Sequence, residues 1–139
     1  MRLPVLLLLS FLLTACARVP DAEAIRDTIH AMADAAENRR GGSVMDHIAA
    51  DFIANDGELD RAGLERFVRA RLLAQAVGVS IGSIEVELAG DRATARFPLT
   101  LTDGSGRWLP DRRTDLDVVT GWKREGGQWN CYNASWTRP

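Results

Sequence analysis

The chain has 139 residues, of which 46% are hydrophobic and 26% are charged, and its formal net charge at pH 7 is −2. This length allows one compact domain and leaves no room for a second of ordinary size. Ordinary apolar content and balanced charge argue against a disordered chain. A net charge close to zero removes the electrostatic reason to expect nucleic acid as a partner.

The first residues have the pattern of a secretory signal. Arg2 precedes an apolar run from Leu3 to Leu13, which is short for a helix that spans a bilayer. The run leads into Leu13-Thr14-Ala15-Cys16, which resembles the bacterial lipobox, where a cysteine is acylated and becomes the mature N-terminus. The resemblance implies a lipoprotein signal peptide over residues 1–15 and a lipidated tether over residues 16–20.

Acylation of Cys16 would attach the protein to a lipid bilayer, because several acyl chains such as palmitate give stable anchoring where a single chain does not. Ala17 follows the cysteine, where an aspartate usually marks retention in the inner membrane. The resemblance therefore implies the bacterial outer membrane, with the domain facing the periplasm. Cys131 would then be the one remaining thiol, so no internal disulfide could form. The pattern around it indicates a small buried residue.

Residues 21–139 form the expected domain, which begins with an amphipathic helix of about four turns. Asp21 stands where an N-cap residue is favoured, and Gly41-Gly42 would end the helix. Its apolar residues recur at helical spacing: Ile25, Ile29, Met32 and Ala36.

Two further helices are predicted before the strands begin. The second starts at Ser43 and has an apolar side formed by Met45, Ile48 and Phe52, and Asn55-Asp56-Gly57 is a turn. Asp60 caps the third, and Gly78 marks its end.

The third helix has three further predicted features. Leu59 and Leu64 are placed to form a hydrophobic staple, and Glu65 can pair with Arg69. The predicted buried stripe is Leu64, Phe67, Val68 and Leu72. A basic stripe of Arg61, Arg66 and Arg69 is by default a solvated surface, although it could meet an acidic partner.

From residue 79 onward the pattern changes from helical to alternating. Strands are predicted over residues 79–89, 92–102, 114–124 and 128–137. The tight turns Gly90-Asp91 and Gly126-Gly127 predict antiparallel hairpins. Helices followed by long hairpins indicate an α+β fold, in which three helices cover a curved antiparallel sheet and leave a concave space.

This order of elements resembles the NTF2-like superfamily, which includes ketosteroid isomerase, scytalone dehydratase, polyketide cyclases and many members without catalytic activity. The residues that carry the resemblance are the stretch Asp51-Phe52-Ile53-Ala54-Asn55-Asp56-Gly57 and the hairpin Trp122-Lys123-Arg124-Glu125-Gly126-Gly127-Gln128-Trp129. The resemblance implies a cystatin-like cone with a pocket, on which this superfamily supports many functions.

An isomerase or dehydratase of this kind would use a pocket carboxylate as base and a tyrosine as oxyanion donor. Asp115 and Asp117 are two residues apart on one strand and hence on one face, and Tyr132 is the single tyrosine. A two-residue loop at Gly126-Gly127 would put Tyr132 on the same side as Asp117, and a three-residue loop on the opposite side. Solvated aspartates and a packed tyrosine are the favoured interpretation.

Four tryptophans lie in the C-terminal third, and at least two of them are expected to fill the core. Trp108 lies in a polar loop where core packing explains it least, and it is the first choice for a contact residue. Trp122 and Tyr132 complete the predicted ligand-binding set.

No metal or other cofactor is predicted. His30 and His47 stand alone on separate predicted helices, whereas zinc needs three or four ligands at short spacings. Asp51 to Asp60 fails as a calcium loop because Ile53 occupies its third position.

The leading hypothesis is a membrane-anchored periplasmic lipoprotein that binds without catalysis. Its partner would be a small apolar ligand in the cone or a protein on the open sheet face, for example as an immunity-type lipoprotein. The alternative is an enzyme that uses Asp115 or Asp117 with Tyr132, and a third hypothesis is a homodimer formed through the sheet face.

Overall fold

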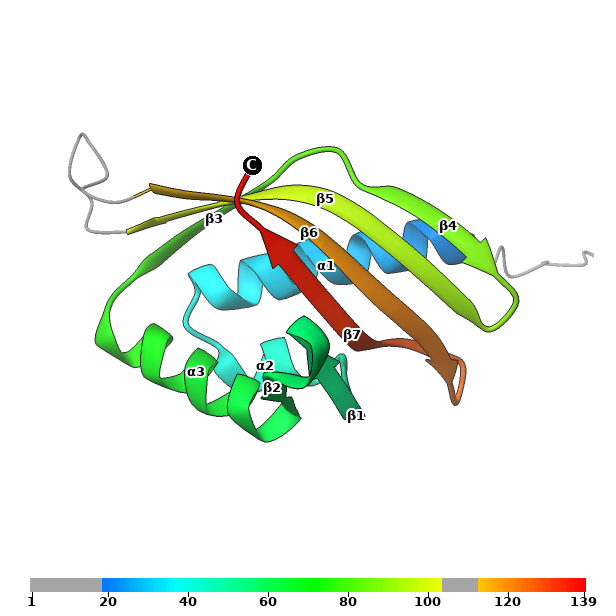
Figure 1. Cartoon of the computed structure of the whole chain (residues 1–139), viewed down its shortest axis with the longest axis horizontal. Coiled ribbons are helices and arrows are strands. Elements are labelled where there is room, and N and C mark those ends of the chain that lie inside the picture. Colours follow the sequence, from blue (N-terminus) through cyan, green and yellow to red (C-terminus); the bar gives the residue numbers. More distant parts are fainter. Residues whose placement is uncertain (1–18, 104–112) are drawn as a thin grey trace, which may run out of the picture.

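The computed structural model describes residues 19–103 and 113–139, which form helices packed on one face of a curved sheet (Figure 1). The helices are α1 (Asp21–Glu37), α2 (Gly41–Met45) and α3 (Arg61–Ala74), with a 3-10 turn at Asn55–Gly57. The strands are β1 (Ile48–Ala54), β2 (Leu59–Asp60), β3 (Val77–Ile81), β4 (Glu85–Ala89), β5 (Arg92–Asp103), β6 (Arg113–Glu125) and β7 (Gln128–Thr137). The predicted α+β class is confirmed.

The sheet has the strand order β2-β1-β7-β6-β5-β3, and β4 pairs with another part of β5. The strand pairs β3–β5, β4–β5, β5–β6 and β6–β7 are antiparallel, as the hairpin turns predicted. The pair β1–β7 is parallel, so the sheet is mixed, and the prediction of a purely antiparallel sheet is wrong in this respect. This pairing joins β1 to a strand more than seventy residues further along the chain.

Helix α1 matches the prediction in length, but both of its ends differ from it. Pro20 is the residue at the N-cap position, and Asp21 is already helical. The Asp21 carboxylate instead forms an ion pair with Arg124 and accepts a hydrogen bond from Trp129 Nε1 at 3.2 Å. At the other end Asn38 caps the helix, so the glycine pair after residue 40 opens α2 instead of closing α1.

The predicted second helix is wrong over most of its length. Helix α2 ends at Met45, and Ile48 begins strand β1. The register of β1 against β7 shifts between Ile48 and Ile53, so the strand does not bury strictly alternate residues. Its buried residues imitate helical spacing: Ile48, Ala49, Phe52 and Ala54.

Helix α3 begins as predicted, because Asp60 Oδ1 accepts a hydrogen bond from Gly63 N at 2.7 Å. The predicted pair of Glu65 and Arg69 is also confirmed, at 3.1 Å. Phe67 is 60% exposed, so its assignment to the buried stripe is wrong. The helix ends at Ala74, four residues before the glycine predicted to end it.

The strand predicted over residues 79–89 is interrupted. Ile81 pairs with Leu99, whereas Glu85 pairs with Arg96, so one extra residue separates the two registers. Pro98 lies opposite the break and has no N–H group to continue a ladder. The chain therefore bulges over residues 82–84 and forms two strands, β3 and β4.

The core lies between α1, β1 and the face of the sheet that α1 covers, here called the inner face. Trp122 and Ile25 are the largest side chains buried completely, and they pack with small residues such as Ala93 and Ala95. The opposite face of β5, β6 and β7, here called the outer face, carries polar side chains. Among residues 19–103 and 113–139, no helix has the length and apolar character needed to span a bilayer.

Candidate functional site

An apolar cleft of about 220 Å³ lies between α1 and the inner face of the sheet. Helix α1 contributes four side chains to it and strands β3 and β5 contribute five. The lining residues are Ile29, Met32, Ala33, Ala36, Val79, Ile81, Phe97, Leu99 and Leu101. We call this site the inner cleft.

The local sequence explains the shape of the inner cleft. Phe97, Leu99 and Leu101 alternate along β5, so all three side chains reach the inner face. On α1, Ala33 and Ala36 are small, and the space that larger residues would fill stays open above the strands. The cleft is therefore a product of helical spacing on one side and strand alternation on the other.

Two hydrogen bonds hold α1 beside the inner cleft. Arg26 Nε donates to Ile84 O at 3.1 Å, and Val79 N donates to Glu37 Oε1 at 2.8 Å. The second bond also satisfies an amide on β3, the strand at this end of the sheet order. The first bond holds α1 to the segment between β3 and β4, and the second holds it to β3, beside the cleft.

The inner cleft offers a ligand apolar contacts, and its nine lining side chains include no acid, base or nucleophile. A preformed apolar cavity of about 150 Å³ is large enough to hold benzene. The inner cleft, at about 220 Å³, is larger than such a cavity and more open to solvent.

Trp122 belongs to the core. Its side chain is 1% exposed, and its Nε1 donates to Thr120 Oγ1 at 2.8 Å, which donates in turn to Ala95 O at 3.1 Å. Trp122 therefore has almost no exposed surface with which to contact a ligand, as the predicted ligand-binding role would require. Trp129, 4% exposed, is likewise a core residue, as expected for at least two of the tryptophans.

Tyr132 lies on the outer face. The Gly126-Gly127 loop has two residues, and Tyr132 forms a bulge where Gly121 pairs with Asn133 and Trp122 with Cys131. A Cβ atom added to Gly121 would lie 3.1 Å from Tyr132 Cζ, so the ring covers that glycine. The Arg92 guanidinium stands 4.8 Å from the ring centroid.

Asp115 and Asp117 share the outer face with Tyr132, as a two-residue loop requires. Asp115 accepts hydrogen bonds from Arg113 Nε at 3.0 Å and from Thr100 Oγ1 at 2.7 Å. These donors hold the pKa of Asp115 below its ordinary value. Asp117 lies four residues along β6 from Gly121, the residue that the Tyr132 ring covers, and this is about 13 Å at strand spacing. The structure brings neither aspartate to the inner cleft.

Trp108 and Cys16, the predicted contact and lipidation residues, lie outside the described residues. Their roles stay predictions. Within residues 19–103 and 113–139, no three His, Cys, Asp or Glu side chains gather in a group that could hold a metal ion.

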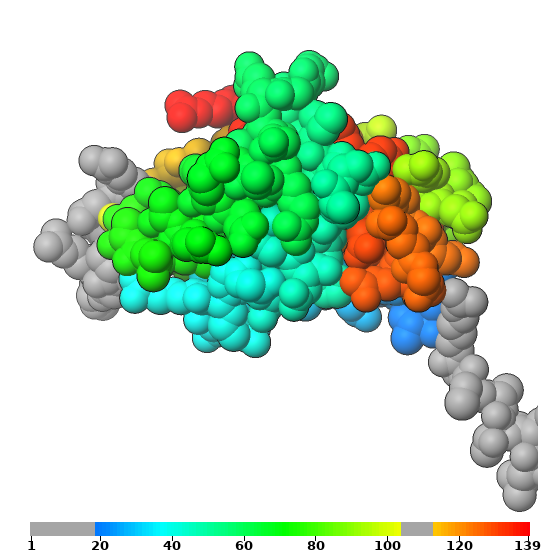
Figure 2. All heavy atoms as spheres, turned by 90° about the horizontal axis from the view of Figure 1, so that it is seen from below, coloured from blue at the N-terminus to red at the C-terminus, as the bar shows by residue number. Residues whose placement is uncertain are grey.

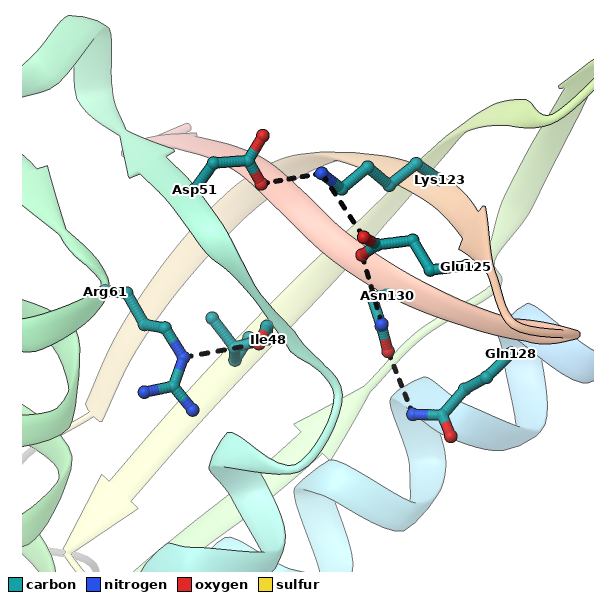
Figure 3. A network of polar contacts seen from close by, with 7 residues as sticks. All are labelled: Ile48, Asp51, Arg61, Lys123, Glu125, Gln128 and Asn130. Carbon is teal, nitrogen blue, oxygen red and sulfur yellow. Dashed lines mark hydrogen bonds and ion pairs between the residues drawn. The ribbon is translucent and has the colours of Figure 1, made fainter.

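A chain of polar contacts crosses the outer face where β1, β7 and β6 adjoin (Figure 3). Lys123 Nζ donates to Asp51 Oδ1 at 2.7 Å and lies 3.7 Å from Glu125. Asn130 continues the chain from Glu125, and Gln128 donates to Asn130. The Lys123 ammonium lowers the pKa of Asp51, and Asp51 raises the pKa of Lys123.

Cys131 is 3% exposed, and burial raises the pKa of its thiol to about 12. The sequence interpretation of a small buried residue is confirmed.

The sequence pattern indicates only part of the inner cleft. Its α1 residues Ile29, Met32 and Ala36 belong to the predicted apolar stripe, which by itself indicates core packing and no cleft. The sequence signal for a cleft is the alternating row Phe97, Leu99 and Leu101, because this row presents more apolar surface than one helix with small residues can cover.

No protein-family model matches the sequence, and no curated protein shows significant similarity to it. Solved structures do match. An NTF2-like protein from Pseudomonas putida KT2440 is 18% identical with a TM-score of 0.72, and the match covers 84% of this chain and 85% of that one. An NTF2-like protein from Cytophaga hutchinsonii ATCC 33406 is 16% identical with a TM-score of 0.70, covering 87% and 100%.

A scytalone dehydratase candidate from Novosphingobium aromaticivorans DSM 12444 is 11% identical with a TM-score of 0.74, covering 85% of this chain and 83% of that one. At these identities the likeness concerns the fold. The chain therefore has the NTF2-like, cystatin-like fold, as the sequence resemblance implied.

Proposed function

We propose that this protein is a binding protein for a small apolar ligand, held in the inner cleft, and that it does not transform the ligand. The observation that carries the proposal is the all-apolar lining of a cleft beside which two backbone-anchored hydrogen bonds hold α1. Apolar clefts of this kind bind by removing ligand surface from water, at roughly 25 cal/mol per Å² of apolar surface buried.

The proposal includes a location. Acylation of Cys16 would attach the domain to the outer membrane on its periplasmic side, where apolar molecules partition into the bilayer and are scarce in water. A binding domain tethered there meets its ligand at the membrane surface. The lipobox-like stretch that precedes the domain supports this part of the proposal.

Ligand binding is tested with Nile red, an uncharged apolar dye whose emission rises in apolar surroundings. Residues 19–139 contain the hydrophobic core that the structure describes, so this segment is suitable for the assay. We expect saturable binding that Ala33→Phe abolishes, because the phenyl ring fills the cleft. Ala31→Phe is the matched control, since Ala31 is on the same helix but exposed. Equal binding by both variants would contradict the proposal.

Anchoring is tested in a bacterial host by detergent phase partition and by the mass of the N-terminal peptide. The wild-type chain should enter the detergent phase with acyl chains on Cys16, and Cys16→Ser should remain in the aqueous phase. Detection of an unacylated Cys16 in the mature protein would remove the membrane part of the proposal and leave the cleft unaffected.

A further inference from the structure

The exposed side of α3 combines apolar and basic residues. Leu73 is 77% exposed and Phe67 is 60% exposed, which are high values for large apolar side chains. Figure 2 shows α3 in green on the surface that is seen from below, next to the cyan segment that contains the end of α1 and α2. The exposed side chains of this helix, here called the α3 ridge, are Ala62, Arg66, Phe67, Arg69, Ala70, Arg71, Leu73 and Ala74.

The α3 ridge is positive although the whole chain carries a formal net charge of −2. Arg61–Ala74 holds four arginines and a single acid, Glu65. Glu65 lies 3.1 Å from Arg69 and 3.8 Å from Arg61, so it is already shared. Within the part of the chain that the structure describes, Arg66 and Arg71 form no ion pair, and their charges face outward.

A groove of about 290 Å³ adjoins the α3 ridge between α3 and the start of α2. Met45, Val68 and Leu72 line it with apolar surface, Arg39 and Arg69 contribute guanidinium groups, and Glu65 contributes the carboxylate that pairs with Arg69. The groove and the ridge thus show the same combination of apolar surface with positive charge.

We propose that the α3 ridge lies on an anionic lipid bilayer. Arginine with phenylalanine and leucine on one exposed helix surface suits the boundary between headgroups and acyl chains, where guanidinium groups pair with phosphates and apolar side chains enter the lipid. The expected tether would keep the domain close to a bilayer, because five residues from Cys16 to Pro20 span at most about 17 Å. The ridge would fix which side of the domain faces the membrane.

The test uses residues 19–139, which have no acyl chain and no signal segment, in flotation with vesicles. One set contains phosphatidylcholine with phosphatidylglycerol, and the other contains phosphatidylcholine alone. We expect binding to the anionic set, weakened by salt. The double variant Arg66→Gln/Arg71→Gln should reduce partitioning about 25-fold, since each arginine contributes about fivefold. Phe67→Ser/Leu73→Ser should also weaken it.

Two substitutions elsewhere are the matched controls. Arg138→Gln removes a charge near the C-terminus, and Leu88→Ser removes an apolar side chain that is 50% exposed on β4. Both should bind like the wild type, and circular dichroism checks that every variant is folded.

Three results would overturn the proposal. The first is absence of binding to anionic vesicles. The second is equal loss in the ridge and control variants. The third is a concentration-dependent dimer in sedimentation that Leu73→Ser abolishes, because the ridge would then face a second copy of this chain. The Nile red and acylation experiments measure ligand binding and anchoring independently of vesicle binding. A negative result with vesicles would therefore leave the proposed function unaffected.

Discussion

The hydrogen bonds of Thr120 provide the sharpest test of the assignment of Trp122 to the core. Thr120 Oγ1 accepts from Trp122 Nε1 and donates to Ala95 O, and both residues of β6 are buried. Thr120→Val keeps the shape of the side chain and removes the hydroxyl. The indole N–H group then stays buried without a partner, which costs about 1–3 kcal/mol, and the bond to Ala95 is lost as well. We expect a destabilisation of about 2 kcal/mol.

The magnitude is measurable, because domains of this size unfold with about 5–15 kcal/mol. Urea unfolding followed by far-ultraviolet circular dichroism gives the free energy without relying on tryptophan fluorescence. Thr120→Ser is the matched control, since it keeps both hydrogen bonds and should cost only the roughly 0.8 kcal/mol of one methyl group.

A double-mutant cycle isolates the contact itself. Trp122→Phe removes the donor, so Thr120→Val should cost at least about 1 kcal/mol less in the Trp122→Phe background than in the wild type. Additive costs would refute the reasoning, and so would a Thr120→Val variant as stable as the wild type. Nile red binding to Trp122→Phe should stay unchanged, because Trp122 does not line the inner cleft.

Three further predictions concern single features. The thiol of Cys131, whose pKa is raised to about 12, should react with a thiol reagent at neutral pH only after denaturant unfolds the chain, and rapid labelling of the folded protein would contradict its burial. The folded pKa of Asp51 lies below its ordinary 3.8 and that of Lys123 above its ordinary 10.5, so their pairing stabilises the fold between these values and is lost as pH falls through the first or rises through the second. Asp51→Asn should therefore make the free energy of unfolding less dependent on pH at both extremes, as measured by urea titrations at several pH values. An unchanged dependence on pH would exclude a contribution of this pair to stability. Asp60→Ala should destabilise the domain by about 1 kcal/mol in the same urea assay, because the amide of Gly63 loses its cap, and no change would show that water replaces it.

Local patterns were sufficient for much of the fold. Helical spacing located α1, a capping aspartate located the start of α3, and glycine turns located the hairpins. The face of Tyr132 was left open between a two-residue and a three-residue loop at Gly126-Gly127, and the structure has the two-residue loop. In each case the determining interactions lie within a few residues of one another along the chain.

The errors arise where distant segments decide the structure. Ile48 to Ala54 forms a strand because β7, far away in sequence, offers it a parallel edge. Its irregular register gives it the burial pattern of a helix. Trp122 illustrates the same limit for the site, because only the packing of α1 over the sheet shows whether an inward tryptophan borders a cleft or fills the core.

The position of β7 in the middle of the sheet order has a consequence for how the chain folds. The core needs Trp129, Cys131 and Ala134, so the helices that precede β7 in sequence lack a completed partner surface until this strand has been synthesised. Loss of β7 would thus remove an interior strand and expose the edges of both of its neighbours, β1 and β6.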